Sequence, residues 1–257
     1  ILDELESILS DSFALRLVSD IPLGVFLSGG VDSSLVAALL QKVSPKPLKT
    51  FTIGFHEHKY NEAPYAKEVA SYLKTEHTEL YCEPRDAYDI ISALPTLYDE
   101  PFGDSSAIPT YLVSKLARGC VGVCLSADGA DELFGGYSNY APSIKLFNML
   151  QRVPPSIRSA IAPLLLSKNT ESVASLVHSV LPKNSQVTNF KDKDLTRANT
   201  MSAKSAMDVF DISKSYWFTD ELNKLLPWMD KQPQLYFEES GDVLNAMMMQ
   251  DMQTYMS

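Results

Sequence analysis

The chain contains few cysteines and little positive charge, and these shortages exclude several classes of protein. Only three of its 257 residues are cysteine, too few for a disulfide framework. Cys120 and Cys124 have no further cysteine or histidine at the spacing of a zinc site, so we expect reduced thiols. The formal net charge of -10 argues against a general nucleic-acid surface, because binding to a phosphate backbone needs clustered lysine and arginine.

Long hydrophobic runs are also missing. No apolar segment approaches the ~20 residues of a membrane span, and no signal peptide opens the chain, so we expect a cytoplasmic protein without membrane contact. A hydrophobic content of 45% is nevertheless ample for a buried core. The first residues have the character of a helix interior and the last ones stop within an apolar pattern, so we expect a segment of a longer protein.

The most informative stretch lies at residues 27–34, where the sequence is LSGGVDSS. An apolar run at 22–27 predicts a buried strand before it, and an apolar pattern of helical period follows at 35–40. Gly29 and Gly30 allow a sharp turn and a close approach of the backbone to a ligand. Because the first N–H groups of a helix lack intrahelical partners and favour an anion, the stretch predicts a phosphate-binding loop.

This loop differs from the common ATP-binding loop, whose lysine reaches the outer phosphates. No lysine occurs between residues 20 and 41. Asp32 stands in the loop instead, and its carboxylate would repel phosphate unless a divalent cation lay between them, so the loop also predicts Mg²⁺. The alternative is that Asp32, Ser33 and Ser34 only cap the helix, worth about 1 kcal/mol, which does not explain the two glycines.

Strands and helices are expected to alternate along the first half of the chain. Strand-like runs occur at 24–27, 49–54, 76–81 and 120–126, and helical patterns at 33–43, 63–73, 87–97 and 107–118. This order predicts an α/β fold with a doubly wound parallel sheet, whose ligands bind beyond the carboxyl ends of the strands. An amphipathic helix is expected over 1–18. We predict a core at 1–145 and a mainly helical C-terminal extension at 146–257.

A second motif at residues 125–137, LSADGADELFGGY, repeats the order of strand, small-residue turn and helix start. Its carboxylates would be favoured by the helix dipole, so surface capping is one interpretation. At the same sheet edge as Asp32, however, Asp131 would offer a second oxygen ligand for the same Mg²⁺. The two motifs together predict a site for metal-bound phosphate.

The sequence resembles the synthetase domain of the glutamine-hydrolysing asparagine synthetases. The matching segments, in order, are residues 20–34 (DIPLGVFLSGGVDSS), 51–55 (FTIGF), 99–102 (DEPF) and 126–137 (SADGADELFGGY). The resemblance implies a sheet of the adenine-nucleotide alpha hydrolase, or PP-loop, type. It also implies that ATP adenylates a carboxylate, that pyrophosphate leaves, and that ammonia then displaces AMP to form an amide.

The same resemblance implies roles for single residues. Those expected to hold the pyrophosphate are Ser28, Gly29, Gly30, Asp32 and Ser33. Those expected to line the adenosine are Leu27, Ile53, Ser126 and Ala127. Asp32 and Asp131 would bind Mg²⁺. Asp128 would accept a proton from attacking ammonia, or it is a turn residue. Ser105 and Ser106 fall where the family shapes its substrate pocket, and turn formation is the alternative for both.

The side chain of aspartate is the expected substrate, giving asparagine, AMP and pyrophosphate. The alternatives are a sugar carboxylate in surface-polysaccharide synthesis, a related β-lactam-forming ligase, and a non-catalytic nucleotide-binding or interaction module. The family's glutaminase domain is expected in the full-length chain. The lysine that the family uses on the acyl-adenylate falls beyond this sequence, so this segment alone is expected to bind ATP without completing the reaction. Ala127 and Ala130 replace two glycines usual in the family, and alanine would be strained at a positive φ.

Overall fold

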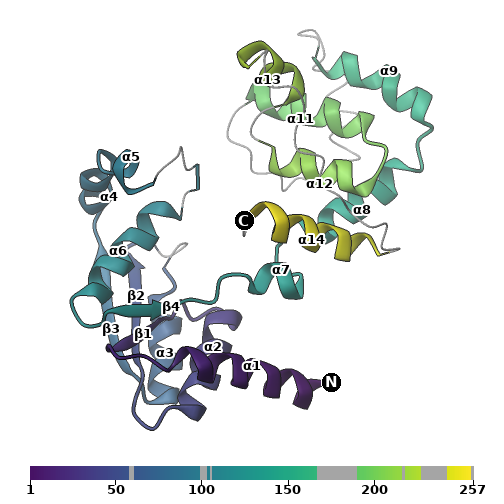
Figure 1. Ribbon diagram of the computed structural model, residues 1–257. Coiled ribbons are helices and arrows are strands. Elements are labelled where there is room, and N and C mark those ends of the chain that lie inside the picture. Colours follow the sequence, from purple (N-terminus) through teal and green to yellow (C-terminus); the bar gives the residue numbers. More distant parts are fainter. Residues whose placement is uncertain are drawn as a thin grey trace. The chain divides into compact units, whose positions relative to one another are not determined.

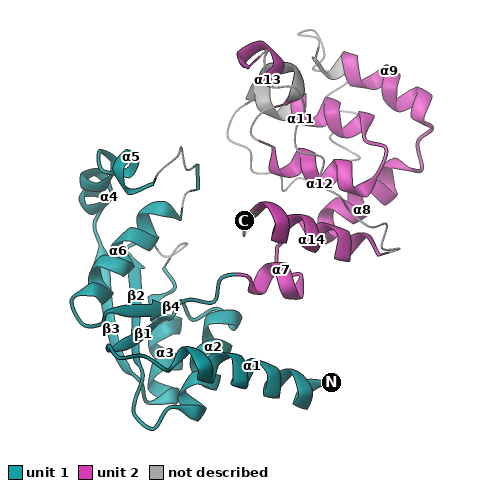
Figure 2. Cartoon of the chain, viewed as in Figure 1, with its two compact units in different colours: residues 1–128 teal, residues 129–257 magenta. Residues whose placement is uncertain are grey.

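The structure, a computed structural model, describes residues 1–57, 61–98, 103–104, 106–166, 190–215, 218–226 and 242–255. The chain divides into two compact units, residues 1–128 and 129–257 (Figures 1 and 2). The first unit contains a parallel sheet, and the secondary structure described in the second unit is helical. The domain boundary expected near residue 145 stays a prediction.

Four parallel strands form the sheet of the first unit. They are β1 (Leu23–Phe26), β2 (Lys49–Phe55), β3 (Glu76–Cys82) and β4 (Val123–Leu125), in the order β3-β2-β1-β4. Val25 of β1 pairs with Thr50 of β2 and with Leu125 of β4, and its side chain is fully buried. The predicted α/β fold with a doubly wound parallel sheet is confirmed.

Helices pack on both faces of this sheet (Figure 1). On one face, α2 (Val31–Val43) and α3 (Ala63–Leu73) bury a cluster that contains Leu27 and Ala66. The connection from β3 to β4 contains α4 (Pro84–Ile91), α5 (Leu94–Leu97) and α6 (Ala107–Arg118). On the other face, α6 packs against Phe26 and Phe51. Helices cover both faces because the connections between parallel strands are right-handed. The chain moves across the sheet from β1 to β3 and then returns to place β4 on the other side of β1, so the later helices lie on the opposite face.

The strand order creates a topological switch point at β1. The chain leaves β1 for β2 on one side, whereas β4 lies on the other side. In open α/β sheets a ligand binds in the crevice beyond the carboxyl ends of two such strands. The loops that follow β1 and β4 both begin at this crevice, and they carry the two predicted motifs.

Two predicted elements differ from the structure in their bounds. The helix expected over 87–97 is divided, because α4 begins earlier, where Glu83 and Asp86 form a capping box, and α5 starts anew at Leu94. Pro95 lacks an N–H group and its ring excludes the carbonyl four residues before it, so no single helix crosses this point. The strand expected over 120–126 is limited to the three residues of β4.

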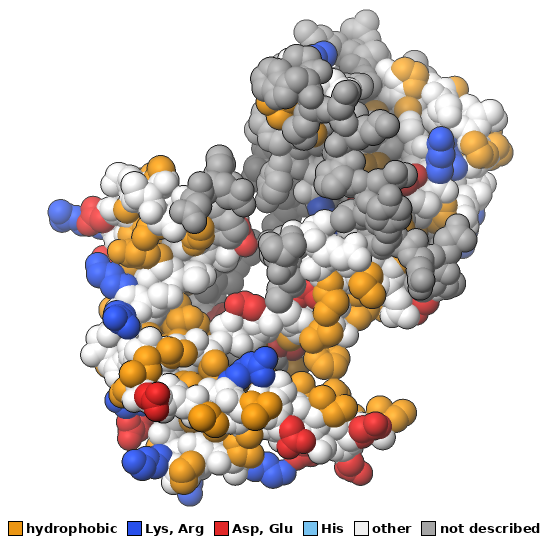
Figure 3. All heavy atoms as spheres, in the orientation of Figure 1, with side chains coloured by type: hydrophobic (Ala, Val, Ile, Leu, Met, Phe, Trp, Pro, Cys, Tyr) orange, Lys and Arg blue, Asp and Glu red, His pale blue; other side chains and the backbone are white. Residues whose placement is uncertain are grey.

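The first helix, α1 (Leu2–Arg16), buries less apolar surface than its sequence pattern predicts. None of its residues is buried, and Leu2 is 80% exposed. The partly buried Phe13 packs against a cluster that contains Val25 and Leu40. Hydrophobic side chains therefore lie among charged ones on the surface along this helix (Figure 3). Within the described ranges, no helix has the length and apolar composition that crossing a membrane requires.

The described helices of the second unit are α7 (Ala130–Phe134), α8 (Tyr140–Leu150), α9 (Pro155–Leu166), α11 (Phe190–Ser202), α12 (Ala206–Lys214), α13 (Thr219–Leu225) and α14 (Val243–Tyr255). Residues of α8, α9, α11, α12 and α14 form two apolar clusters. A buried carboxylate joins three of these helices. Asp251 of α14 is 2% exposed and accepts a hydrogen bond of 2.8 Å from the Tyr140 hydroxyl of α8. Its other oxygen pairs with Lys214 Nζ of α12 at 2.5 Å.

Candidate functional site

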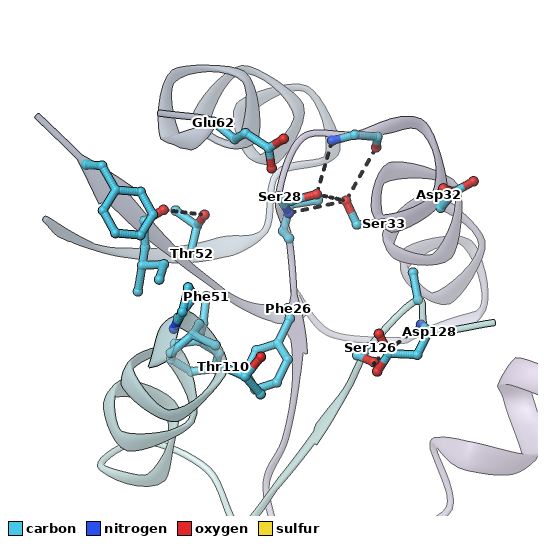
Figure 4. Close-up of a pocket in the computed structure, with 17 residues that line it drawn as sticks. Phe26, Ser28, Asp32, Ser33, Phe51, Thr52, Glu62, Thr110, Ser126 and Asp128 are labelled. Atoms are coloured by element: carbon cyan, nitrogen blue, oxygen red, sulfur yellow. Dashed lines mark hydrogen bonds between the residues drawn. The ribbon is translucent and has the colours of Figure 1, made fainter. Parts of the chain in front are cut away.

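A cavity of about 440 Å³ lies at the carboxyl ends of β1, β2 and β4 (Figure 4). It is lined from both predicted motifs, from β2 and from α6, all within the first unit. The lining residues are Phe26, Leu27, Ser28, Gly30, Asp32, Ser33, Phe51, Thr52, Ile53, Phe55, Glu62, Pro109, Thr110, Val113, Ser126, Ala127 and Asp128. The cavity therefore occupies the switch point of the sheet, where a ligand is expected.

The loop after β1 is held closed by its own serines. The hydroxyl oxygens of Ser28 and Ser33 lie 2.9 Å apart, and the Ser28 N–H donates to Ser33 Oγ at 3.2 Å. The Gly30 N–H donates to Ser28 Oγ at 3.2 Å, and the Ser33 hydroxyl donates to the Gly30 carbonyl at 3.3 Å (Figure 4). Four contacts among three residues thus fix the loop before any ligand arrives.

The first turn of α2 faces this loop without a side-chain cap. Gly30 is the N-cap residue and makes no side-chain cap hydrogen bond. The alternative reading of Asp32, Ser33 and Ser34 as caps therefore fails, since none of them occupies the N-cap position. The leading N–H groups of α2 have no intrahelical acceptor, and an anion in the cavity is suited to them.

Gly29 has a different place from the other loop residues. Its φ is +82°, and a Cβ there would lie 2.5 Å from Ala66 N and 2.7 Å from Tyr65 C, both backbone atoms of α3. It is absent from the residues that line the cavity and instead seats the loop on α3. Only glycine satisfies both the positive φ and the close approach.

The second motif contributes Ser126, Ala127 and Asp128 to the cavity. The Ser126 hydroxyl donates a short hydrogen bond to Asp128 Oδ2, and the Asp128 side chain is exposed. The positive φ of this turn occurs at Gly129, at 92°. Lys74 is the sole non-glycine residue with a positive φ among those described, so the strain expected at Ala127 and Ala130 does not arise.

The charge of the lining is one-sided. Asp32, Glu62 and Asp128 contribute carboxylates, and no lysine, arginine or histidine is among the described residues of the lining. A polyphosphate in this cavity thus has amides and hydroxyls to bind, but the described lining offers no side-chain cation to balance its charge. This donor set fits Mg²⁺, which typically uses one or two carboxylates together with phosphate oxygens. In the described ranges no three His, Cys, Asp or Glu side chains are grouped to hold a metal by themselves.

Comparison with known proteins decides the family. The family model described as asparagine synthase matches residues 4–257. The chain belongs to the asparagine synthase family. It represents the synthetase part of that family, an ATP-dependent ligase domain, as the four motifs predict.

Several members of the asparagine synthase family are similar in sequence. A putative glutamine-hydrolysing asparagine synthetase 2 of Methanocaldococcus jannaschii is 41% identical over 177 residues, covering 68% of this chain and 34% of that protein. Asparagine synthetase 1 of Bacillus subtilis is 36% identical over 158 residues, covering 62% of this chain and 25% of that protein. Asparagine synthetase B of Escherichia coli is 32% identical over 163 residues, covering 56% of this chain and 29% of that protein. The chain thus spans about a third or less of the length of these relatives.

Glu62 is the charged residue of the cavity that sequence reasoning missed. It occupies the N-cap position of α3, but its side chain makes no cap hydrogen bond. Asn61 Oδ1 accepts the Ala63 N–H at 3.2 Å instead. Figure 4 shows the Glu62 carboxylate beside the Ser28 loop. The position of Glu62 just before a predicted helix was the one sign in the sequence of a role for it. Most acidic residues at such positions, however, serve only to cap the helix.

The apolar lining was missed for another reason. Phe26 and Phe51 belong to the buried strands, and Thr110 and Val113 come from α6, which reaches the cavity because the chain crosses back over the sheet. Nothing in their local sequence distinguishes them from ordinary core residues.

Two further predicted site residues are not among the described lining of this cavity, and two predicted features lie outside the described residues. Asp131 lies in the first turn of α7, in the second unit, so its pairing with Asp32 stays a prediction. Ser106 is exposed, its N–H donates to Asp104 Oδ1 at 2.8 Å, and it does not line the cavity. Ser105 and the motif at 99–102 lie outside the described residues.

Proposed function

We propose that this chain binds ATP in the cavity and activates a carboxylate for amide formation, with the side chain of aspartate as that carboxylate and ammonia as the nitrogen donor. The observation that carries the proposal is the meeting of the two motifs in one cavity at the switch point, around a loop that is already closed. Family membership supports the reaction class.

Each end of ATP has suitable groups in the cavity. The β- and γ-phosphates would lie against the loop of Ser28, Gly30 and Ser33, where N–H groups and hydroxyls converge. The adenosine would lie against Leu27, Ile53, Ser126 and Ala127, which line the cavity beside the aromatic rings of the sheet. Gly29 would support the phosphates indirectly, by fixing the loop on α3.

The metal has a proposed place as well. Asp32 and Asp131 would hold Mg²⁺, and Asp32 is the member of this pair that lines the cavity. When bound, Mg²⁺ would neutralise the charge that develops on the departing pyrophosphate. A cavity lined by carboxylates and without a described cationic side chain needs such a counter-charge to accept ATP.

The reaction needs positioning and charge stabilisation more than a protein nucleophile. A carboxylate oxygen of the substrate attacks the α-phosphorus of ATP, and the bond from that phosphorus to the bridging oxygen breaks as pyrophosphate leaves. The nitrogen of ammonia then attacks the acyl carbon, and AMP departs with the electron pair of the acyl–oxygen bond. The loop N–H groups stabilise the charge on pyrophosphate. Asp128, oriented by the Ser126 hydroxyl, would accept the proton that the nitrogen loses.

Exchange of labelled pyrophosphate into ATP, measured on the full-length protein with a panel of carboxylates, tests the activating step. We expect exchange with aspartate that Asp32→Asn abolishes without changing the thermal unfolding midpoint. The matched control is Asp11→Asn, which removes a carboxylate from exposed α1. Full exchange in Asp32→Asn would refute the metal assignment, and exchange with a uronic acid but not with aspartate would refute the choice of substrate.

A further inference from the structure

Glu62 lies at the start of α3, and among the residues that the structure describes none bonds to its carboxylate. The Glu62 carbonyl accepts hydrogen bonds from the N–H groups of Tyr65 and Ala66, at 3.0 and 3.1 Å, so its backbone begins the helix. Its side chain makes no cap hydrogen bond, and it is exposed within the lining of the cavity. The helix dipole favours an acid at this position but does not require it to face a ligand site.

Asn61 performs the capping that Glu62 does not. Its Oδ1 accepts one N–H from the first turn of α3 at 3.2 Å and the Phe55 N–H at 3.4 Å, which joins the end of β2 to the start of α3. One turn further on, the backbone of α3 fits closely against Gly29, where a Cβ would lie 2.5 Å from Ala66 N. The start of α3 is thus fixed to both β2 and the phosphate loop, and Glu62 has a defined place beside them.

That place corresponds to the middle of a bound ATP molecule. In the proposed complex the phosphates lie against the loop that begins at Ser28, and the base lies against Leu27 and Ile53. Because Leu27 and Ser28 are consecutive, the ribose that connects base and phosphates passes the point where these two residues meet. Figure 4 shows the Glu62 carboxylate beside Ser28, with Asp32 on the other side of the loop.

A carboxylate suits the ribose and does not suit the phosphates. An ionised carboxylate only accepts hydrogen bonds, and phosphate oxygens are acceptors that carry charge of the same sign. The 2′- and 3′-hydroxyls of ribose are neutral donors on adjacent carbons, and the two oxygens of one carboxylate can accept both. Acidic residues bind ribose hydroxyls in dinucleotide-binding α/β folds. Within the described ranges Glu62 is not grouped with two other side chains that could hold a metal.

We propose that Glu62 binds the ribose diol of ATP and makes the cavity selective for ribonucleotides over deoxyribonucleotides. The inference rests on the proposed function, which assigns ATP to this cavity. Both hydroxyls donate to the carboxylate, which fixes the sugar beside Ser28. Because the α-phosphate is attached to the same sugar, this contact also positions the phosphorus that the substrate carboxylate attacks.

The test is calorimetric titration of the full-length protein with ATP, 2′-deoxy-ATP and 3′-deoxy-ATP, in excess Mg²⁺ and without a carboxylate substrate. Each missing hydroxyl should weaken binding to the unchanged protein by about 10- to 100-fold, the range expected for a hydrogen bond to a charged group. Glu62→Ala should weaken ATP binding by at least this factor and bind the three nucleotides equally. The matched control is Glu68→Ala, which removes an exposed carboxylate of the same helix outside the described lining and should keep the full discrimination.

The outcomes separate this inference from the proposed function. Equal binding of the three nucleotides to the unchanged protein overturns the ribose contact and leaves the proposed function intact, whereas failure of ATP to bind overturns both. A Glu62 that acted only through its charge would repel all three alike. Tighter binding of all three to Glu62→Ala, with the discrimination retained, therefore overturns the inference.

A second variant covers the case in which Glu62→Ala lowers the unfolding midpoint. Glu62→Gln keeps the length of the side chain and one acceptor oxygen, so it should retain only part of the discrimination against the two deoxynucleotides. Undiminished discrimination in Glu62→Gln overturns the inference as well.

Discussion

Replacing Gly29 and Gly30 separately by alanine should separate stability from binding within one loop. At Gly29 the added Cβ would lie 2.5 Å from Ala66 N, a backbone atom, and φ is +82°. A positive φ costs alanine about 1–2 kcal/mol, and forcing a methyl group into a packed contact costs about 1–3 kcal/mol more. The smaller conformational freedom of alanine in the unfolded chain offsets about 0.4–1 kcal/mol of this loss. We expect Gly29→Ala to lower the free energy of unfolding by about 1–4.5 kcal/mol.

Gly30 is the matched control because its surroundings differ. Its φ is -68°, which alanine adopts freely, and an added Cβ would lie 3.3 Å from Ser28 Oγ. Alanine is a poorer N-cap than glycine, so we expect Gly30→Ala to lose only about 0.5–1 kcal/mol of stability. Since Gly30 lines the cavity, the same methyl group should weaken binding of an ATP analogue.

Urea unfolding of both variants, followed by circular dichroism, measures the first effect, and calorimetric titration with the ATP analogue measures the second. The reasoning is refuted if Gly29→Ala is as stable as Gly30→Ala, because the contact with α3 would then be absent. It is also refuted if Gly30→Ala binds the analogue as tightly as the unchanged protein.

Three further predictions concern the side chains of Tyr140, Asp211 and Cys124. Tyr140→Phe removes a hydrogen bond to the buried carboxylate of Asp251 and should lower the free energy of unfolding by about 1.5–3 kcal/mol in urea titrations; a loss below about 0.5 kcal/mol would contradict that bond. Desolvation raises the pKa of the Asp211 carboxyl above its usual value, although the hydrogen bond from Gln250 lowers it in part. Because the folded protein then favours the protonated carboxyl, Asp211 contributes most to stability below about pH 4, and this contribution is lost as the pH rises through the folded pKa. Asp211→Asn should therefore stabilise the protein at pH 7 and flatten the pH dependence of urea unfolding above about pH 4, and a less stable variant would contradict this sign. Burial raises the pKa of the Cys124 thiol to about 11, so iodoacetamide at pH 8 should label it far more slowly in the folded than in the unfolded protein, as followed by mass spectrometry of its peptide.

The sequence predicts the fold well where local pattern and tertiary structure agree. Apolar runs followed by small-residue turns indicate β1 and β4, and the alternation of strands with helical patterns indicates the parallel sheet. The helix expected over 87–97 was divided because Pro95 interrupts it. The apolar pattern of α1 predicts burial of more residues than Phe13, because a helical period records a possible face and not the presence of a surface to cover it.

In the candidate site, too, the sequence identifies residues of a local pattern but not those brought in by tertiary packing. Its loop residues could be named because glycine and serine between a strand and a helix have few purposes other than turning and binding. Glu62 and Thr110 could not, because they reach the cavity through tertiary packing. The replacement of glycine by Ala127 raised an expectation of strain that the structure removes, since the turn takes its positive φ at Gly129. Sequence alone does not report which residue of a turn adopts the unusual angle.

The contact between Gly29 and α3 has a consequence for protein engineering. The loop is fixed by its own serines and rests on α3, a helix from another part of the chain. It therefore loses little conformational entropy when a ligand binds. The same contact makes the loop a poor candidate for transfer by itself. A graft of residues 27–34 onto a new scaffold would lose the backbone of Tyr65 and Ala66 that sets its shape. The smallest transferable module is therefore discontinuous in sequence, and consists of β1, the loop, the start of α2 and the first turns of α3.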